Sequence, residues 1–154
     1  MSGPDSAHPR PIQLQIGVAA PVEKVWAYLS DIATHSEWMS DAVSVEFLTE
    51  QQRGVGTSVK VMTRVGPLRS VDLITVTHWA ENRSIVADHR GSVTGTARFE
   101  LFEDGDATKV LWFEDLDFPW WMGGKLGLFV ARPILRRIWA GNLQRFKQIV
   151  ETGV

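Results

Sequence analysis

Two histidines occupy corresponding positions near the ends of neighbouring predicted strands. His78 closes the predicted strand 68–78, and His89 lies near the end of the predicted strand 83–90. Successive side chains of a strand point to opposite faces, so each histidine shares a face with the apolar residues two and four positions before it. An imidazole with a pKa of about 6.5 can transfer protons near neutral pH. If those apolar residues face the interior, both imidazoles point into it and could transfer protons; a histidine that bonds a carboxylate or faces solvent is the other interpretation.

Two carboxylates lie on strands of the same predicted sheet. Asp72 shares the strand face of His78, and Glu114 shares its face with apolar residues of the predicted strand 107–116. A carboxylate buried among apolar residues has a raised pKa and can act as a general base. The strand 107–116 is apolar on both faces, so the sequence leaves the direction of Glu114 open. His78, His89, Asp72 and Glu114 are therefore the candidate catalytic residues.

The residue types and motifs that the sequence lacks exclude several kinds of site. There is no cysteine, which excludes thiol catalysis, disulfides and cysteine metal ligands. There is also no dinucleotide-binding or Walker-type glycine loop, no HExxH zinc motif and no GxSxG nucleophile elbow. We therefore expect neither a cofactor nor a metal. The predicted strands are acidic overall, which argues against nucleic-acid binding.

The pattern of apolar residues predicts an α+β domain. Residues 12–19 alternate as a half-buried strand does, and two short helices follow, the second containing His35. Six further strands, joined by short glycine-rich turns, should pair antiparallel. The C-terminal segment has helical periodicity and should begin near Arg132 or, with a bend at Pro133, near Lys125. The six predicted strands are 43–49, 56–65, 68–78, 83–90, 94–103 and 107–116.

The chain is expected to form one domain, residues 12–152, preceded by a flexible tail, residues 1–11. The first residues lack the apolar core of a signal peptide, and no stretch approaches the roughly 20 apolar residues of a membrane-spanning helix. We expect a cytoplasmic protein that is either a monomer or a homodimer.

Four short segments carry a resemblance to a known superfamily. They are residues 20–26 (APVEKVW), Asp31-Ile32 followed by His35 and Trp38, residues 54–57 (GVGT), and residues 105–110 (GDATKV). In these segments the sequence resembles the START-related helix-grip superfamily (SRPBCC), in its polyketide cyclase/dehydrase and lipid-transport branch. The resemblance implies a curved seven-stranded antiparallel sheet wrapped around a long C-terminal helix, with an apolar tunnel between them. Members carry lipids, bind hormones or polyketides, or fold and dehydrate polyketide chains, and they share no invariant catalytic set.

An apolar tunnel predicts a hydrophobic ligand of the lipid, polyketide or isoprenoid type, which the protein binds as a carrier or sensor. The alternative is an enzyme of the cyclase or dehydratase type that uses the candidate acid/base groups in the same cavity. The residues expected to line the tunnel are apolar and come from both the sheet and the helices. They are Trp38, Val59, Val61, Ile74, Val76, Ile85, Phe99, Leu101, Trp112, Trp120, Met122, Leu135, Trp139 and Phe146.

The segment 118–124 (FPWWMGG) and the helix after it favour a further alternative. The chain has a net charge of −2, yet residues 125–154 hold six basic residues and one acidic residue. Tryptophan and methionine before a basic helix are typical of a segment that contacts a membrane. The second alternative is therefore a peripheral lipid or quinone chaperone, with Trp120, Trp121 and Met122 in contact with lipid. A basic helix that is simply solvated is the other interpretation.

Overall fold

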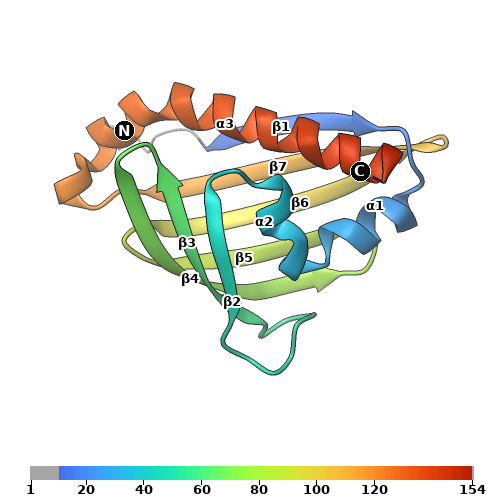
Figure 1. Cartoon of the computed structure of the whole chain (residues 1–154), viewed down its shortest axis with the longest axis horizontal. Coiled ribbons are helices and arrows are strands. Elements are labelled where there is room, and N and C mark those ends of the chain that lie inside the picture. The colour runs from blue at the N-terminus through green and yellow to red at the C-terminus, as the bar shows by residue number, and fades with distance from the viewer. Residues whose placement is uncertain (1–10, 154) are drawn as a thin grey trace, which may run out of the picture.

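The computed structural model describes residues 11–153, and its main element is one seven-stranded antiparallel sheet. The strand order is β1-β7-β6-β5-β4-β3-β2, so the first strand pairs with the last and the sheet curls around its concave face (Figure 1). Most of the predicted tail lies outside the described residues. The strands are β1 (Ile12–Val18), β2 (Ala42–Phe47), β3 (Ser58–Val65), β4 (Leu68–Ala80), β5 (Ser84–Gly91), β6 (Thr94–Asp104) and β7 (Ala107–Asp117).

One long helix, α3 (Gly124–Thr152), lies across the sheet, and the short helices α1 (Val22–Leu29) and α2 (His35–Trp38) lie near its C-terminal end (Figure 1). Two 3-10 turns, η1 (Ile32–Thr34) and η2 (Trp120–Met122), precede α2 and α3. The predicted helix-grip fold is confirmed. No helix within residues 11–153 is both long and apolar enough to cross a membrane.

The helix α3 follows the longer of the two predicted courses and continues through Pro133. Proline has no amide hydrogen, so the carbonyl of Phe129 loses its partner within the helix. Both residues lie on the exposed side of α3, where solvent can replace that bond. The opposite side is buried against the sheet and the short helices. Its buried residues are Leu128, Leu135, Trp139, Asn142, Leu143, Phe146 and Val150.

A bulge in β4 changes which of its side chains face the interior. The pairing with β5 shifts between Val76, which lies opposite Ala87, and His78, which lies opposite Val86. The extra residue reverses the inward and outward alternation from that point on. His78 is consequently exposed, with its Nε2 3.1 Å from the Ser84 Oγ. The prediction that His78 points into the interior is wrong.

The residue that takes the inward position after the bulge is Trp79. Its ring packs edge-on against Trp26 of α1, with ring centroids 5.3 Å apart. Arg53, from the β2–β3 loop, lies over the same ring at 5.4 Å from its centroid. A tryptophan buries far more apolar area than a histidine, so the bulge stabilises the contact between the sheet and α1.

Candidate ligand-binding cavity

A cavity of about 230 Å³ lies between the concave face of the sheet and the N-terminal half of α3. Strands β3 to β7 supply most of its wall, and Ala131, Leu135 and Trp139 of α3 close the opposite side. Its exposed end lies where Leu68, the first residue of β4, and Met122 of η2 both line it. This volume is at the small end for ligand pockets, which typically measure roughly 300–1,000 Å³.

Two alanines on neighbouring strands leave the room that forms the centre of the cavity. Ala87 of β5 lies opposite Ala97 of β6, and Ala97 lies opposite Glu114 of β7. Val76 of β4 continues the same row. All four residues line the cavity. The methyl groups of Ala87 and Ala97 are shorter than the side chains on either side of them, so they leave a hollow, whereas protein cores are normally close-packed.

Ten of the fourteen residues predicted to line the tunnel do line this cavity. They belong to alternating positions of the central strands and to the inner face of α3, as the periodicity predicted. They are Val59, Val61, Ile74, Val76, Ile85, Phe99, Trp112, Met122, Leu135 and Trp139.

Three other predicted lining residues, Trp38, Leu101 and Phe146, are buried in the core and do not line the cavity. The Trp38 ring lies 5.1 Å from Phe146 and 5.8 Å from Trp112, measured between ring centroids, so these aromatic rings fill the space behind the cavity wall. Leu101 follows Phe99 on the inner face of β6, where the sheet contacts α1. The short helices therefore close this end of the space between the sheet and α3.

Trp120 is the fourth residue whose predicted position is wrong. Its side chain is 88% exposed and that of Trp121 is 54% exposed, whereas Met122, the next residue, lines the cavity. The three residues form a single 3-10 turn between Pro119 and Gly123, and such a turn directs successive side chains to different sides. The segment 118–124 therefore presents methionine to the cavity and both tryptophans to the solvent.

Glu114 and His89 meet on the wall of the cavity. The Nε2 of His89 lies 3.6 Å from the Oε2 of Glu114, and both side chains are buried. The indole Nε1 of Trp112 donates a hydrogen bond to the other carboxyl oxygen, Oε1, at 3.0 Å. The Oε2 has no hydrogen-bond partner within the described residues. The pair therefore presents an unused carboxyl oxygen and an imidazole nitrogen beside the cavity.

Burial sets the charge of both groups. It raises the pKa of Glu114 from 4.5 to about 8, a shift that the hydrogen bond from Trp112 opposes and the nearby Asp41 strengthens. Burial also lowers the pKa of His89, although Asp72 and Asp88 oppose this shift. Near neutral pH the carboxyl group is therefore mostly protonated and the imidazole is neutral. The two groups lie within ion-pair distance, yet they form a neutral pair rather than a salt bridge.

Asp72 also lines the cavity, but its carboxylate is already engaged. Its Oδ2 accepts a hydrogen bond from Ser70, and its Oδ1 accepts one from the backbone N–H of Val93 at 3.1 Å. A Cβ at Gly91, the residue opposite, would approach this Oδ1 to 2.6 Å, so only glycine fits there. These contacts join Asp72 of β4 to the β5–β6 turn and hold its carboxylate in place.

Two further polar residues of the cavity lie near the short helices. The Nε2 of His35 donates to the carbonyl of Leu29 at 2.7 Å, and burial lowers the pKa of His35. Asp41, just after α2, accepts hydrogen bonds from the Trp139 Nε1 at 3.1 Å and from the Asn142 Nδ2 at 2.8 Å. The sequence did not single out Asp41, because a carboxylate in a turn is normally solvated.

Asn142 connects this polar group to the middle of α3. Its Oδ1 accepts hydrogen bonds from both the backbone N–H and the hydroxyl of Ser40, each at 3.0 Å, while its Nδ2 donates to Asp41. These hydrogen bonds all join Asn142 to the connection between α2 and β2, and Asn142 is only 1% exposed. A buried amide bonded in this way fixes the position of α3 over the cavity.

A comparison with protein-family models matches residues 11–151 to the family described as polyketide cyclase / dehydrase and lipid transport. The chain belongs to this family. The match covers nearly every residue that the structure describes, including the whole cavity. The family description includes both enzymes and transport proteins, so membership alone does not decide between catalysis and carriage. A search of curated proteins finds no match.

Solved structures share the fold of this family member at low sequence identity. A Thermus thermophilus protein is 14% identical, with a TM-score of 0.76 over 92% of this chain and 97% of its own. The Zhui aromatase/cyclase of a Streptomyces species is 18% identical, with a TM-score of 0.70 over 94% and 97%. A START superfamily protein of Mycobacterium smegmatis is 19% identical, with a TM-score of 0.68 over 94% and 96%. These likenesses show the fold.

Proposed function

We propose that the protein binds a hydrophobic small molecule in the cavity beneath α3, as a carrier or sensor. The observation that carries this proposal is the row of Ala87 and Ala97, which leaves the centre of an otherwise aromatic and aliphatic interior unfilled. An unfilled apolar space costs stability, and an apolar ligand that occupies it gains roughly 25 cal/mol per Å² of buried apolar surface.

The charges around the cavity favour a neutral ligand. Three acidic side chains line it, Asp41, Asp72 and Glu114, and the one lysine or arginine in its wall, Arg69, is exposed near the start of β4. An anionic group would be repelled by Asp41 and Asp72 and poorly solvated in the apolar cavity. The protonated Glu114 can instead donate a hydrogen bond to a carbonyl oxygen, and the neutral His89 can bond a hydroxyl. The ligand class is therefore an apolar molecule with a carbonyl or hydroxyl group.

The preference for a neutral group can be measured with probes of equal chain length. We expect a medium-chain methyl ketone to bind at least about tenfold more tightly than the corresponding fatty carboxylate at pH 7, because the carboxylate must be desolvated beside like charges. Isothermal titration calorimetry gives both dissociation constants. Glu114→Gln should keep ketone binding, since an amide can also donate a hydrogen bond. Equal or tighter binding of the carboxylate contradicts the assignment of the ligand class.

A second candidate function is proton-transfer catalysis in the same cavity, as a cyclase or dehydratase needs. Three of the four candidate catalytic residues support it, because His89, Asp72 and Glu114 line the cavity together. The specific observation is the unpaired Oε2 of Glu114 beside the His89 Nε2. A protonated carboxyl group can bond a substrate carbonyl while a neutral imidazole removes a proton from the adjacent carbon.

Enolisation of a bound ketone tests this candidate without requiring the natural substrate. The imidazole takes the α-proton, the C–H electron pair becomes the enol double bond, and the Glu114 proton passes to the carbonyl oxygen. Reversal in D₂O places deuterium on the α-carbon. We expect NMR to show exchange at least about a hundredfold faster than in buffer, and expect His89→Asn to abolish this gain. If the ketone binds but its α-protons exchange no faster than in buffer, the result contradicts catalysis and is consistent with the carrier function.

A further inference from the structure

The outer face of α3 changes character halfway along the helix. Positions 18 residues apart lie on the same side of a helix, because 18 residues complete five turns. Leu126 and Val130 therefore occupy the same sides of α3 as Gln144 and Gln148, and all four are exposed. The second half of the helix has the polar outer face that a solvated helix needs. The first half does not.

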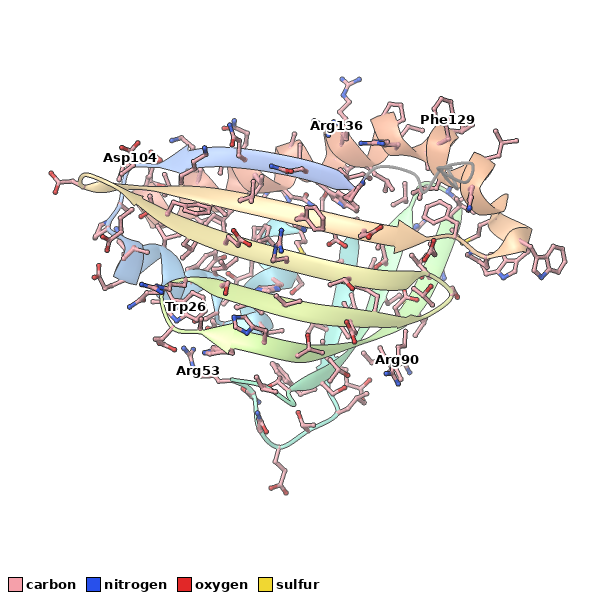
Figure 2. The ribbon with its side chains drawn as sticks, turned by 180° about the vertical axis from the view of Figure 1, so that it is seen from behind. Trp26, Arg53, Arg90, Asp104, Phe129 and Arg136 are labelled. Atoms are coloured by element: carbon pink, nitrogen blue, oxygen red, sulfur yellow. The ribbon has the colours of Figure 1, made fainter. Side chains whose placement is uncertain are left out.

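Exposed apolar residues gather on this first half and on the turn before it. Their side chains are at least 54% exposed, and Phe129 projects from the outer side of α3, away from the sheet (Figure 2). Soluble proteins rarely leave such a contiguous group uncovered unless it contacts a partner or a membrane. The group, called the mouth patch below, comprises Trp120, Trp121, Leu126, Phe129, Val130 and Ile134.

The mouth patch lies beside the open end of the cavity. The same part of α3 supplies Ala131 and Leu135 to the cavity wall, and Met122 joins them from η2. Leu68, which follows the β3–β4 turn as the first residue of β4, also lines the cavity and is 53% exposed. Both views place this turn next to the first half of α3 (Figures 1 and 2). A surface seated on the mouth patch would therefore face the cavity opening.

The segment that contains the patch, residues 118–150, carries charges of one sign. Residues 118–150 contain six basic residues and no acidic residue. Arg132 and Arg136 donate to the backbone carbonyls of Pro11 and Gln13, which fixes them along β1. Lys125 forms no ion pair within residues 11–153. The first half of α3 thus combines tryptophan, aliphatic side chains and unneutralised positive charge.

We propose that the mouth patch docks on an anionic lipid bilayer, with the tryptophans and the outer side of α3 at the interface. Indole and aliphatic side chains enter the interfacial region, while lysine and arginine approach the phosphates. The charge argues against a second copy as the occupant. A symmetric dimer through this patch would bring two basic surfaces together, each carrying Lys125 and Arg137, whereas anionic lipid neutralises them. The inference does not depend on which ligand the cavity holds.

Vesicle co-sedimentation tests this docking with the whole chain. We expect wild type to sediment with vesicles of equal parts phosphatidylcholine and phosphatidylserine, and expect release when salt is raised from about 0.1 M to about 1 M. The double variant Leu126→Gln with Val130→Gln gives the first half of α3 the glutamines found at the equivalent positions of the second half. It should lower the partition coefficient between vesicles and buffer at least about tenfold. Lys125→Gln with Arg137→Gln should lower it similarly, because each basic residue near the surface contributes about fivefold.

The matched control is Gln144→Ala with Gln148→Ala, which alters the equivalent outer positions of the second half and should leave vesicle binding unchanged. Circular dichroism and thermal melting verify that each variant is folded. We expect all of them to fold, because the altered side chains are exposed. Wild type that stays in the supernatant with anionic vesicles at low salt overturns the proposal. So does a wild-type dimer in size-exclusion chromatography that Leu126→Gln with Val130→Gln converts to a monomer, because the patch would then be an interface between copies.

Discussion

Replacement of Ala97 by phenylalanine should weaken ligand binding by more than an order of magnitude while leaving the protein folded. The new ring enters the hollow between Ala87 and Glu114, where it occupies space that a ligand would fill. If the ligand loses contact with about 100 Å² of apolar surface, binding weakens by about 2.5 kcal/mol, which is roughly sixtyfold. Stability should change by no more than about 2 kcal/mol, since the ring fills a void instead of displacing packed atoms.

The measurement is calorimetric titration with the methyl ketone, together with urea unfolding of each variant. Ala140→Phe is the matched control, because it adds the same side chain on the exposed side of α3. It should bind ligand as wild type does. Undiminished binding by a folded Ala97→Phe protein would place the ligand outside the cavity and refute the proposed site.

Glu114→Gln should make the protein more stable than wild type at alkaline pH. The carboxyl group has a pKa of about 8 in the folded protein and about 4.5 when exposed in the unfolded chain. Between these values the folded state binds a proton that the unfolded state has lost, so the free energy of unfolding falls as pH rises. At about 1.4 kcal/mol per pKa unit, the loss above pH 8 reaches at most about 5 kcal/mol. Glutamine accepts the bond from Trp112 without titrating.

The buried histidines have the opposite pH dependence. Burial lowers the pKa of His35 and of His89, so below pH 6.5 the unfolded chain binds protons that the folded protein excludes. Their contribution to stability is complete above pH 6.5 and is lost as pH falls from there through the lowered pKa of each folded histidine. Wild type should therefore be most stable near pH 6.5. The free energy of unfolding of the Glu114→Gln protein should rise up to the same pH and stay constant above it.

Urea unfolding at half-unit steps from pH 5 to pH 9 measures both curves. The stability difference between Glu114→Gln and wild type should grow steadily with pH across the window from about 4.5 to about 8. Glu103→Gln, which alters an exposed glutamate on β6, serves as the control. Its free energy of unfolding should change with pH as that of wild type does. A difference between Glu114→Gln and wild type that is independent of pH would mean that Glu114 is ionised in the folded protein.

The fold could be predicted from the sequence because its signals are local and agree with one another. The turns that separate the strands, the alternation within them and the periodicity of the last helix all appear in short windows of the chain. The same alternation placed Val59, Val61, Ile74 and Val76 correctly on the cavity wall. It failed after Val76, because one inserted residue reverses every later position and the sequence around His78 gives no sign of a bulge.

The depth of the cavity could not be predicted, because it depends on contacts between distant segments. Trp38 and Phe146 have the apolar character expected of lining residues, yet their rings pack together and close one end. Asp41 became part of the cavity only through its bonds to Trp139 and Asn142, about a hundred residues later in the chain. The direction of Glu114, left open by a strand apolar on both faces, is settled by the pairing of β7 with β6, which sets Glu114 opposite Ala97.

Native mass spectrometry of freshly purified protein tests the binding claim most directly. We predict that wild type carries a tightly held apolar compound, or takes up an added methyl ketone, and that denaturation releases it. Ala97→Phe, prepared in the same way, should have the bare mass of the chain. Wild type that stays bare after incubation with methyl ketones, isoprenoid alcohols and aromatic polyketide-like compounds would contradict the account, as would a compound retained equally by folded Ala97→Phe.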